Sequence, residues 1–310
     1  MLKIKKYAAI DIGSNAMRLL IMNIVETKGK DPVFNKSSLI RVPIRLGQDV
    51  FTQGEISVES KRRMIEAMQA FYLLMRVNKV DRFMACATSA MREADNGQEV
   101  AEAVFAASKI KINIIDGEKE AMIIASTDLK NFINQTKNVM FVDVGGGSSE
   151  FTIFKEGVPL ASKSFRNGTV RLLNDMVSKS VWNDIHTWVK EETKDLQDLI
   201  VIGSGGNINK AFKMSGKSQE KPLSYSYLNQ QLTKLTEMTY DERIAILGLN
   251  PDRADVIIPA LRIYTFAMKA SSAKQIYVPK IGVSDGIVKA IYFLQIPLPY
   301  QTIEYEQFSH

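Results

Sequence analysis

The sequence Phe-Val-Asp-Val-Gly-Gly-Gly-Ser-Ser-Glu-Phe at residues 141–151 decides how the rest of the chain is interpreted. Apolar residues lead into a carboxylate, Asp143, and three glycines, two serines and a second acid, Glu150, follow it. Glycines let a backbone turn tightly and bring its N–H groups close to a ligand, because no Cβ intervenes. Such N–H groups form a concave anion site, to which serine hydroxyls add donors. The stretch therefore predicts a phosphate-binding loop, whose ligands are Gly145, Gly146, Gly147 and Ser148.

The position of Asp143 adds a metal to this prediction. Asp143 stands where the incoming strand ends, so its side chain is expected to point toward the same loop. A carboxylate beside bound phosphate usually holds a divalent cation, since two anions otherwise repel each other. We therefore expect a combined phosphate and Mg²⁺ site. A plain glycine-rich hairpin with a capped end is the alternative interpretation.

Two other kinds of phosphate loop are excluded by the residues after the glycines. A Walker loop needs a lysine followed by serine or threonine at the start of a helix, but Gly147 is followed by Ser-Ser-Glu. A dinucleotide fingerprint also opens a helix after its glycines. Residues 151–154, Phe-Thr-Ile-Phe, instead alternate as a strand does. The loop is therefore predicted to join two strands.

A second copy of this pattern occurs near the start of the chain. Residues 7–16 read Tyr-Ala-Ala-Ile-Asp-Ile-Gly-Ser-Asn-Ala, in which an apolar strand ends near Asp11 and a small turn follows. The order of strand, aspartate, glycine turn and strand suggests an internal duplication. We expect two similar lobes facing each other across a cleft, with both loops around one phosphate chain.

Composition limits the class of protein. The chain has 310 residues, 45% of them hydrophobic and 24% charged, with a formal net charge of +6, and these values are those of an ordinary globular protein of about two domains. We expect no membrane span, no nucleic-acid binding and a cytoplasmic location, because no apolar stretch, dense basic run or signal sequence is present. The single cysteine, Cys86, lies in a short apolar strand and is expected to be an inert packed thiol.

Other segments are ambiguous when each is taken alone. Arg92 follows hydroxyl residues at a predicted helix start, which fits either an anion ligand or a plain N-cap with a surface arginine. Gly205 lies in a second glycine turn, which fits either phosphate binding or a tight strand–helix connection. Glu120 lies in the first turn of a helix, where an acid commonly complements the helix dipole. Residues 47–54 predict a loop, and Ser57 predicts the cap of a helix that reaches Val77.

Together the motifs resemble the exopolyphosphatase/guanosine pentaphosphate phosphatase (Ppx/GppA) family of the actin-like ATPase and sugar kinase superfamily. The resemblance covers residues 7 to 290, nearly the whole chain. The matching segments, in chain order, are Ala9–Asn15, Arg18–Leu20, Ala87–Ala94, Gly117–Ala121, Asp143–Glu150, Gly168–Leu172, Gly203–Asn207 and Gly282–Gly286.

The resemblance implies an α/β fold of two ribonuclease-H-like domains, residues 1–121 and 122–310, flanking a cleft. It makes Glu120 the catalytic residue that activates water, with Asp143 and Glu150 as acids that bind Mg²⁺ or orient that water. The phosphate ligands that it adds are Asp11, Gly13, Ser14, Asn15, Arg92 and Gly205. The pattern departs from the family at Ala16 and Asn207, and the chain looks like the short form of the family.

The expected function is Mg²⁺-dependent hydrolysis of the terminal phosphoanhydride of inorganic polyphosphate. Guanosine pentaphosphate is the alternative substrate, and a homodimer is expected from the resemblance. A sugar kinase or actin-like ATPase of the same superfamily is a competing enzyme, although the loop acids follow the hydrolase pattern. A non-catalytic sensor of guanosine polyphosphates is the alternative from another class.

Overall fold

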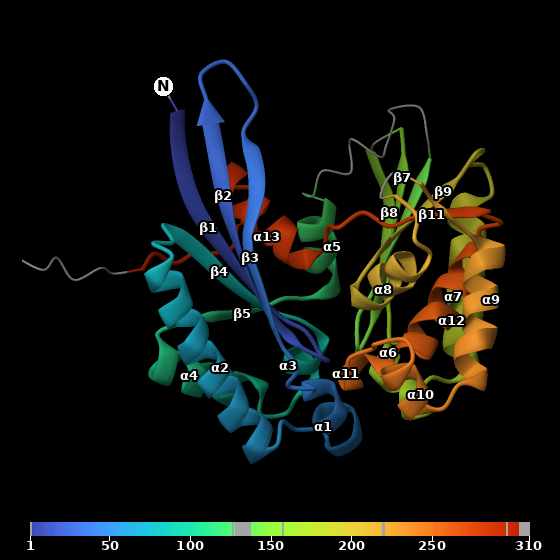
Figure 1. The fold of residues 1–310 in the computed structure, drawn as a ribbon, viewed down its shortest axis with the longest axis horizontal. Helices are drawn as coiled ribbons and strands as arrows, with labels where there is room; N and C mark the ends of the chain where they lie inside the picture. The colour runs from blue at the N-terminus through green and yellow to red at the C-terminus, as the bar shows by residue number, and fades with distance from the viewer. Residues whose placement is uncertain are drawn as a thin grey trace, which may run out of the picture. The chain divides into compact units, whose positions relative to one another are not determined.

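The computed structural model describes residues 2–303 except 126, 128–137, 157, 219–220 and 296. The chain divides into two compact units. The first unit comprises residues 1–127 and 283–310, and the second comprises residues 128–282. Each unit has helices packed on a mixed sheet (Figure 1), in agreement with the predicted α/β class.

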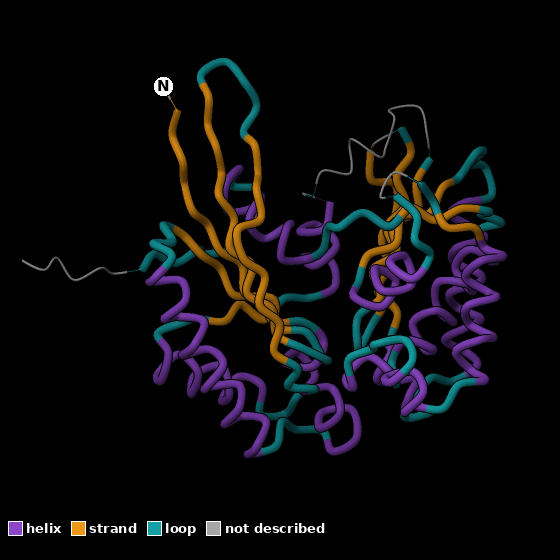
Figure 2. Tube along the Cα trace, viewed as in Figure 1, coloured by secondary structure: helices purple, strands orange, loops and turns teal. Residues whose placement is uncertain are grey.

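The first unit is built on a five-stranded sheet in the order β3-β2-β1-β4-β5. Its strands are β1 (Leu2–Ile12), β2 (Met17–Thr27), β3 (Val33–Val42), β4 (Arg82–Ala87) and β5 (Ile112–Ile114). β1 pairs antiparallel with β2 along its whole length, and parallel with β4 only from Tyr7 onward. The ribbon β1–β2–β3 therefore extends beyond the shorter strands (Figure 2). Residues 7–12 are buried, as expected for an apolar run in a central strand.

Helices complete the first unit. They are α1 (Leu46–Gln53), α2 (Val58–Val77), α3 (Ser89–Glu93), α4 (Gly97–Ser108), α5 (Gly117–Ala125) and α13 (Val283–Phe293). The predicted start of α2 is confirmed, because the Ser57 side chain accepts a hydrogen bond from Ser60 N–H (3.2 Å). α2 also packs against α4.

The last helix changes the predicted division of the chain. α13 packs on β1, β2, β4 and α5, and Figure 1 shows it in red beside the blue strands. Its residues Val283, Ile287 and Ile291 are buried. The predicted second domain included residues 283–310, but the structure places them in the first unit because α13 contributes to the first core. The predicted boundary at residue 121 falls inside α5.

Residues 46–53 form helix α1, where a loop over 47–54 was predicted. Leu46, Val50 and Phe51 are buried, so one face of this short helix belongs to the core. The N–H of Gly47 donates to the carbonyl of Ser14 (2.7 Å), which ties the helix to the turn after β1. The prediction was wrong because two glycines and a short apolar spacing indicate a loop when this tertiary contact is not known.

The second unit contains a six-stranded sheet in the order β10-β11-β9-β6-β7-β8. Its strands are β6 (Val139–Val144), β7 (Ser149–Lys155), β8 (Val158–Phe165), β9 (Ile200–Ser204), β10 (Leu223–Ser224) and β11 (Gln275–Tyr277). β6 runs antiparallel to β7 and parallel to β9. The prediction that the triple-glycine loop joins two strands is confirmed.

Helices also cover this second sheet. They are α6 (Thr169–Leu173), α7 (Lys179–Thr193), α8 (Gly206–Met214), α9 (Tyr225–Glu237), α10 (Tyr240–Ala245), α11 (Pro251–Ala254) and α12 (Ile257–Ala270). α12 is central, since it contacts α6, α7, α8, α9 and β6. Across the described parts of the chain, no helix has the length and apolar character that a membrane span requires.

The two sheets share one topology. The order β3-β2-β1-β4-β5 of the first sheet corresponds to β8-β7-β6-β9-β11 of the second, where β10 is an additional edge strand. A register shift falls between Ile21 and Met22 where β2 pairs with β3, and between Ile153 and Phe154 where β7 pairs with β8. Ile21 and Ile153 are separated by the same number of residues as Asp11 and Asp143. This agreement is what the predicted internal duplication requires.

Candidate active site

Two buried carboxylates face each other at the end of the hairpin β6–β7. Asp143 and Glu150 are paired across the antiparallel strands, so their side chains lie on the same face of the sheet. Their exposed fractions are 8% and 2%, and a carboxylate oxygen of one lies within 4.8 Å of one of the other. Glu150 Oε1 accepts hydrogen bonds from Ser148 Oγ (2.5 Å) and Ser164 Oγ (3.0 Å). The two carboxylates thus provide oxygen ligands that are already close together, as a divalent cation requires.

The loop between these strands is held by the segment that opens α6. The carbonyl groups of all three glycines accept backbone hydrogen bonds from this segment. The bonds run from Thr169 N–H to Gly145 O (3.0 Å), from Val170 N–H to Gly146 O (2.8 Å) and from Gly168 N–H to Gly147 O (3.2 Å). Arg171 Nε also donates to Gly147 O (2.8 Å). The approach is so close that a Cβ on Gly168 would lie 2.3 Å from Gly146.

This arrangement directs the N–H groups of the loop. In a trans peptide the N–H points opposite to the carbonyl of the same unit. Because α6 binds the carbonyls, the N–H groups of Gly146, Gly147 and Ser148 point away from α6. None of these three N–H groups donates to another described residue. Adjacent N–H groups directed to one side form an anion-binding concavity.

A second glycine turn lies beside Asp143. Gly205 has φ 122°, a conformation that a residue with a side chain rarely adopts. A Cβ at this position would lie 3.1 Å from the Val144 carbonyl and 3.6 Å from Asp143 Oδ1. The buried Tyr264 hydroxyl of α12 donates to the Ser204 carbonyl, which holds the residue before Gly205 in place. The structure therefore places Gly205 beside Asp143, and its role in phosphate binding stays a prediction.

Positive charge gathers near the same turn. Arg253 Nη1 donates to the Gly206 carbonyl (3.1 Å), and Lys210 and Lys213 lie on the helix that Gly206 opens. Partial burial, and then the charges of Lys213 and Arg253, lower the pKa of Lys210. A cluster whose members disfavour each other's charge is a favourable place for an anion.

The first unit has its own version of the hairpin. Gly13 N–H donates to Ala16 O (3.1 Å) to close the turn between β1 and β2. Asp11 is buried and forms an ion pair with Arg18, at 2.6 Å between Oδ2 and Nη1. Ser14 Oγ lies 3.0 Å from Ser89 Oγ, at the start of α3.

The remaining predicted residues of the first unit lie on α3 and α5. Arg92 Nη1 donates to the Ile115 carbonyl (2.6 Å), just before α5. Glu120 lies in the first turn of α5 and is 6% exposed. Burial, followed by the charges of Asp11 and Glu120, raises the pKa of the Cys86 thiol to about 12. Cys86 is therefore a neutral core thiol at physiological pH, and the two carboxylates lie near the end of β4.

The predicted site residues are thus divided between the units, and their roles stay predictions. The second unit brings together Asp143, Gly145, Gly146, Gly147, Ser148, Glu150 and Gly205. The first unit contains Asp11, Gly13, Ser14, Asn15, Arg92 and Glu120.

Three residues that hold the glycine turns or Glu150 in place were not predicted from the sequence. Arg171 lies inside the quoted motif at 168–172, which is the signal that points to it. Ser164 reaches Glu150 only through the β7–β8 register, so no local pattern identifies it. Tyr264 stands alone as a hydroxyl-bearing aromatic in an apolar helix, where a buried tyrosine usually needs a hydrogen-bond partner.

Comparisons with known proteins agree with this architecture. Residues 24–292 match the model of the Ppx/GppA phosphatase family. The chain is 30% identical over 278 residues to a bifunctional 3-dehydroquinate synthase/phosphatase of Fusobacterium nucleatum, over 81% of this chain but only 41% of that protein. It is 20% identical over 303 residues to exopolyphosphatase 1 of Mycobacterium tuberculosis, over 91% of this chain and 87% of that protein.

Solved structures show the same fold. An exopolyphosphatase from Cytophaga hutchinsonii matches with a TM-score of 0.80 and 23% identity, over 93% of this chain and 97% of the other. A Ppx/GppA family member from Aquifex aeolicus matches with a TM-score of 0.75 and 21% identity, over 94% and 99% of the two chains. The predicted α/β class, in two units, is confirmed. The chain belongs to the Ppx/GppA phosphatase family and is a phosphoanhydride hydrolase.

Proposed function

We propose that the chain is an exopolyphosphatase, which hydrolyses the terminal phosphoanhydride of inorganic polyphosphate and releases phosphate. The observation that supports this most directly is the clamped triple-glycine loop, whose N–H groups point to one side next to two buried carboxylates. Catalysis of phosphoryl transfer consists mainly of positioning the phosphates and stabilising charge on their oxygens. The loop and the acids provide both functions.

In the proposed reaction a water molecule attacks the terminal phosphorus, and Glu120 accepts the proton of that water. The bond between the phosphorus and the bridging oxygen breaks, and the shortened polyphosphate leaves with the electron pair. The glycine turns at Gly13 and Gly145 bind phosphate oxygens through backbone N–H groups, together with Ser14 and Arg92. A general base of this kind contributes about 10²–10⁴-fold to the rate.

The proposed cofactor is Mg²⁺, held by Asp143 and Glu150. The fit rests on two observations: both side chains are buried, and like charges lie within 4.8 Å of each other. Carboxylate oxygens are the ligands that Mg²⁺ prefers, together with substrate phosphates and water. When bound, the ion neutralises charge on the phosphate oxygens.

Guanosine pentaphosphate is the alternative substrate. The clamped loop recognises phosphates, and the cations Lys210, Lys213 and Arg253 suit any extended polyanion near the second turn. These features therefore fit both substrates, and the relatives named as exopolyphosphatases favour polyphosphate. The sensor hypothesis is weaker, since pure binding of an anion does not require two buried acids beside the cradle.

Phosphate release in the presence of Mg²⁺ tests the proposal. The substrates are polyphosphate of two chain lengths and guanosine pentaphosphate, with Glu120→Gln as the test variant. Glu118→Gln is a matched control, because Glu118 lies in the same helical turn but is exposed. We expect release from polyphosphate, a loss of about 10²–10⁴-fold in Glu120→Gln and no loss in the control.

The other outcomes also decide the matter. Cleavage of the nucleotide alone replaces polyphosphate by guanosine pentaphosphate as the substrate. Binding of both compounds without release by the wild type supports the sensor hypothesis and overturns the catalytic one. Equal activity of the wild type and Glu120→Gln removes Glu120 from the mechanism.

A further inference from the structure

Helix α12 of the second unit presents an unusual set of side chains on one face. The residues lie at spacings of three, four and seven, so they project from the same side of the helix. They are Arg262, Thr265, Phe266 and Lys269. α12 contains no aspartate or glutamate, so this face has two positive charges and no negative one.

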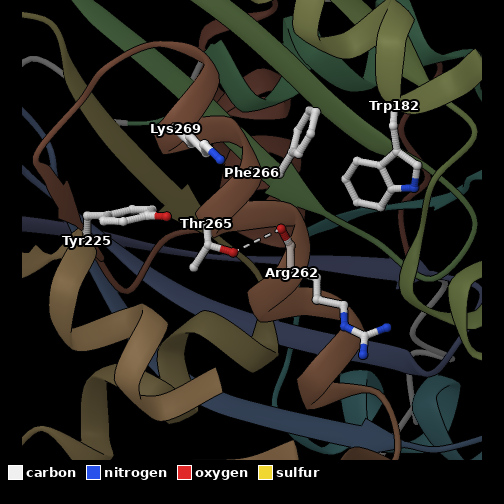
Figure 3. Close-up of a pocket in the computed structure, with 6 residues that line it drawn as sticks. All are labelled: Trp182, Tyr225, Arg262, Thr265, Phe266 and Lys269. Carbon is white, nitrogen blue, oxygen red and sulfur yellow. Dashed lines mark hydrogen bonds between the residues drawn. The ribbon is translucent and has the colours of Figure 1, made fainter. Parts of the chain in front are cut away.

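Two more aromatic residues turn this face into a pocket. Trp182 from α7 and Tyr225 from the start of α9 join the α12 residues around a cavity of about 290 Å³ that is open to solvent (Figure 3). The rings of Trp182 and Phe266 meet edge to face, with centroids 4.7 Å apart and planes at 63°. The volume is close to the lower end of small-molecule pockets, about 300–1,000 Å³.

The polar groups of the pocket are available to a ligand, except the buried Thr265 hydroxyl, which donates to the Leu261 carbonyl (2.8 Å). Within the described part of the chain, the side chains of Arg262 and Lys269 form no ion pair or hydrogen bond, and no acid lines the pocket. The hydroxyl of Tyr225 and the indole N–H of Trp182 likewise donate to no described residue. The two cations are seven residues apart, or about 10 Å along the helix, with Phe266 between them.

We propose that this pocket binds a nucleotide. The base stacks on the aromatic surface of Trp182 and Phe266, and the phosphates are held by Arg262 and Lys269. Aromatic side chains provide stacking surfaces for bases of any sequence. Guanidinium and ammonium groups bind phosphate oxygens through charge-assisted hydrogen bonds. The pocket provides both kinds of contact within the length of a nucleoside diphosphate.

Other ligands fit less of the pocket. A simple phosphate uses the cations but leaves three aromatic side chains without a function. An apolar ligand uses the rings but leaves the two exposed cations without a bound counter-charge. An acidic peptide satisfies the charges, but a pocket of this size and shape suits one compact ring rather than an extended chain.

The pocket and the proposed catalytic loops lie on different faces of one helix. Tyr264 precedes Thr265 in sequence, yet its hydroxyl points inward and donates to the Ser204 carbonyl beneath Gly205. A ligand on α12 is therefore separated from Asp143 by the helix itself. The inference is independent of the proposed polyphosphatase reaction, and a failure of one leaves the other intact.

Titration calorimetry with ADP on the full chain, in EDTA, tests the proposal. We expect one saturable site in the wild type and at least about tenfold weaker binding in the double variant Arg262→Ala/Lys269→Ala, because two charge-assisted contacts are lost. Phe266→Leu is expected to weaken binding about fivefold or more through lost stacking. Lys190→Ala, an exposed lysine of α7 outside the pocket, is the matched control and should bind as the wild type does. Circular dichroism confirms that each variant is folded.

Several results would overturn the proposal. One is the absence of saturable binding by the folded wild type up to millimolar ADP. Another is binding that the pocket variants leave unchanged but Asp143→Asn removes, which assigns ADP to the catalytic loops. Equal affinity for pyrophosphate and ADP, insensitive to Phe266→Leu, indicates a site for phosphate alone. Tighter binding of hexaglutamate than of ADP indicates a docking site for an acidic peptide instead.

Discussion

The two hairpins β1–β2 and β6–β7 have the same backbone but opposite charge at one position. In each, a glycine two residues after the aspartate closes the turn, from Gly13 N–H to Ala16 O in one and from Gly145 N–H to Ser148 O in the other. The pairing is the same as well. Asp11 is opposite Arg18, whereas Asp143 is opposite Glu150.

This difference changes the electrostatics at the end of each hairpin. The first aspartate has its counter-charge in the neighbouring strand, at 2.6 Å. The second has another carboxylate there, and both are buried. Buried like charges are stable only when a cation or proton joins them. The duplication thus supplies two phosphate-loop backbones, of which the second is suited to bind a metal.

The largest effect is expected when the acid that distinguishes the second hairpin is removed. Glu150→Gln keeps the shape and the hydrogen-bond acceptor of the side chain but removes a proposed Mg²⁺ ligand. We expect phosphate release to fall about 10³-fold, which corresponds to roughly 4 kcal/mol of transition-state stabilisation. Steady-state assays at saturating Mg²⁺ measure this loss, with the exposed Glu191→Gln of α7 as the control. A variant as active as the wild type would show that the acid pair does not distinguish the hairpins functionally.

The strand next to each aspartate gives a second comparison. Parallel pairing places Cys86 beside Asp11 and Ser204 beside Asp143. The folded protein keeps the Cys86 proton up to a pKa of about 12, while the unfolded chain releases it above about pH 9. The folded state therefore binds more protons in this window, and the free energy of unfolding falls as the pH rises from 9 to 12.

The titration of this thiol is expected to lower the free energy of unfolding by as much as about 4 kcal/mol. Each pKa unit between 9 and about 12 corresponds to about 1.36 kcal/mol. Urea unfolding of the wild type and Cys86→Ala from pH 8 to 11 measures the part of this fall that occurs below pH 11, about 2.7 kcal/mol, as a difference between the two proteins, because other groups titrate in both. The variant should lose less stability with rising pH. Parallel curves for the two proteins would mean that the thiol titrates normally in the folded state.

The sequence was sufficient for the features that short stretches determine. Both glycine turns and their aspartates were located, because a strand, an acid and glycines are adjacent in the chain. The helix from the Ser57 cap to Val77 was also predicted, and the face it turns to the core is buried at Met64, Met68, Phe71 and Met75. Local chemistry and periodicity determine such features, so the sequence shows them directly.

Features that depend on distant contacts were not predictable in this way. The clamp of α6 on the glycine carbonyls joins segments about twenty residues apart, and Ser164 reaches Glu150 only through a strand register. α13 joins the first unit across the whole second unit in sequence. Nothing in a single sequence indicates such pairings. The homodimer stays a prediction for the same reason, since contacts between chains leave no local pattern.

Mg²⁺ should stabilise the protein through the second hairpin. A ligand that binds only the folded state adds about 2.7 kcal/mol at a concentration of 100 times its Kd. We expect the Tm of the wild type to rise with Mg²⁺, and the rise to be largely absent in Glu150→Gln. Asp11→Asn should keep the rise, because its hairpin has an arginine opposite the aspartate. Thermal unfolding with Mg²⁺ or EDTA measures both; an equal Mg²⁺ response of all three proteins would contradict the assignment of the metal to Asp143 and Glu150.

The smallest effects are expected on the free energy of unfolding in the absence of metal. Removing one acid should change this free energy in opposite directions in the two hairpins. Asp11→Asn removes the carboxylate that forms the ion pair with Arg18, and the expected loss is only about 1–2 kcal/mol because Arg18 is about one third exposed. Glu150→Gln removes repulsion between neighbouring carboxylates while Ser148 and Ser164 still have an oxygen acceptor, so stability should rise by about 1 kcal/mol. Urea unfolding in EDTA at pH 7.5 measures both changes. If both variants lost stability equally, the carboxylate pair would already be neutralised within the protein, and the second hairpin would need a metal no more than the first does.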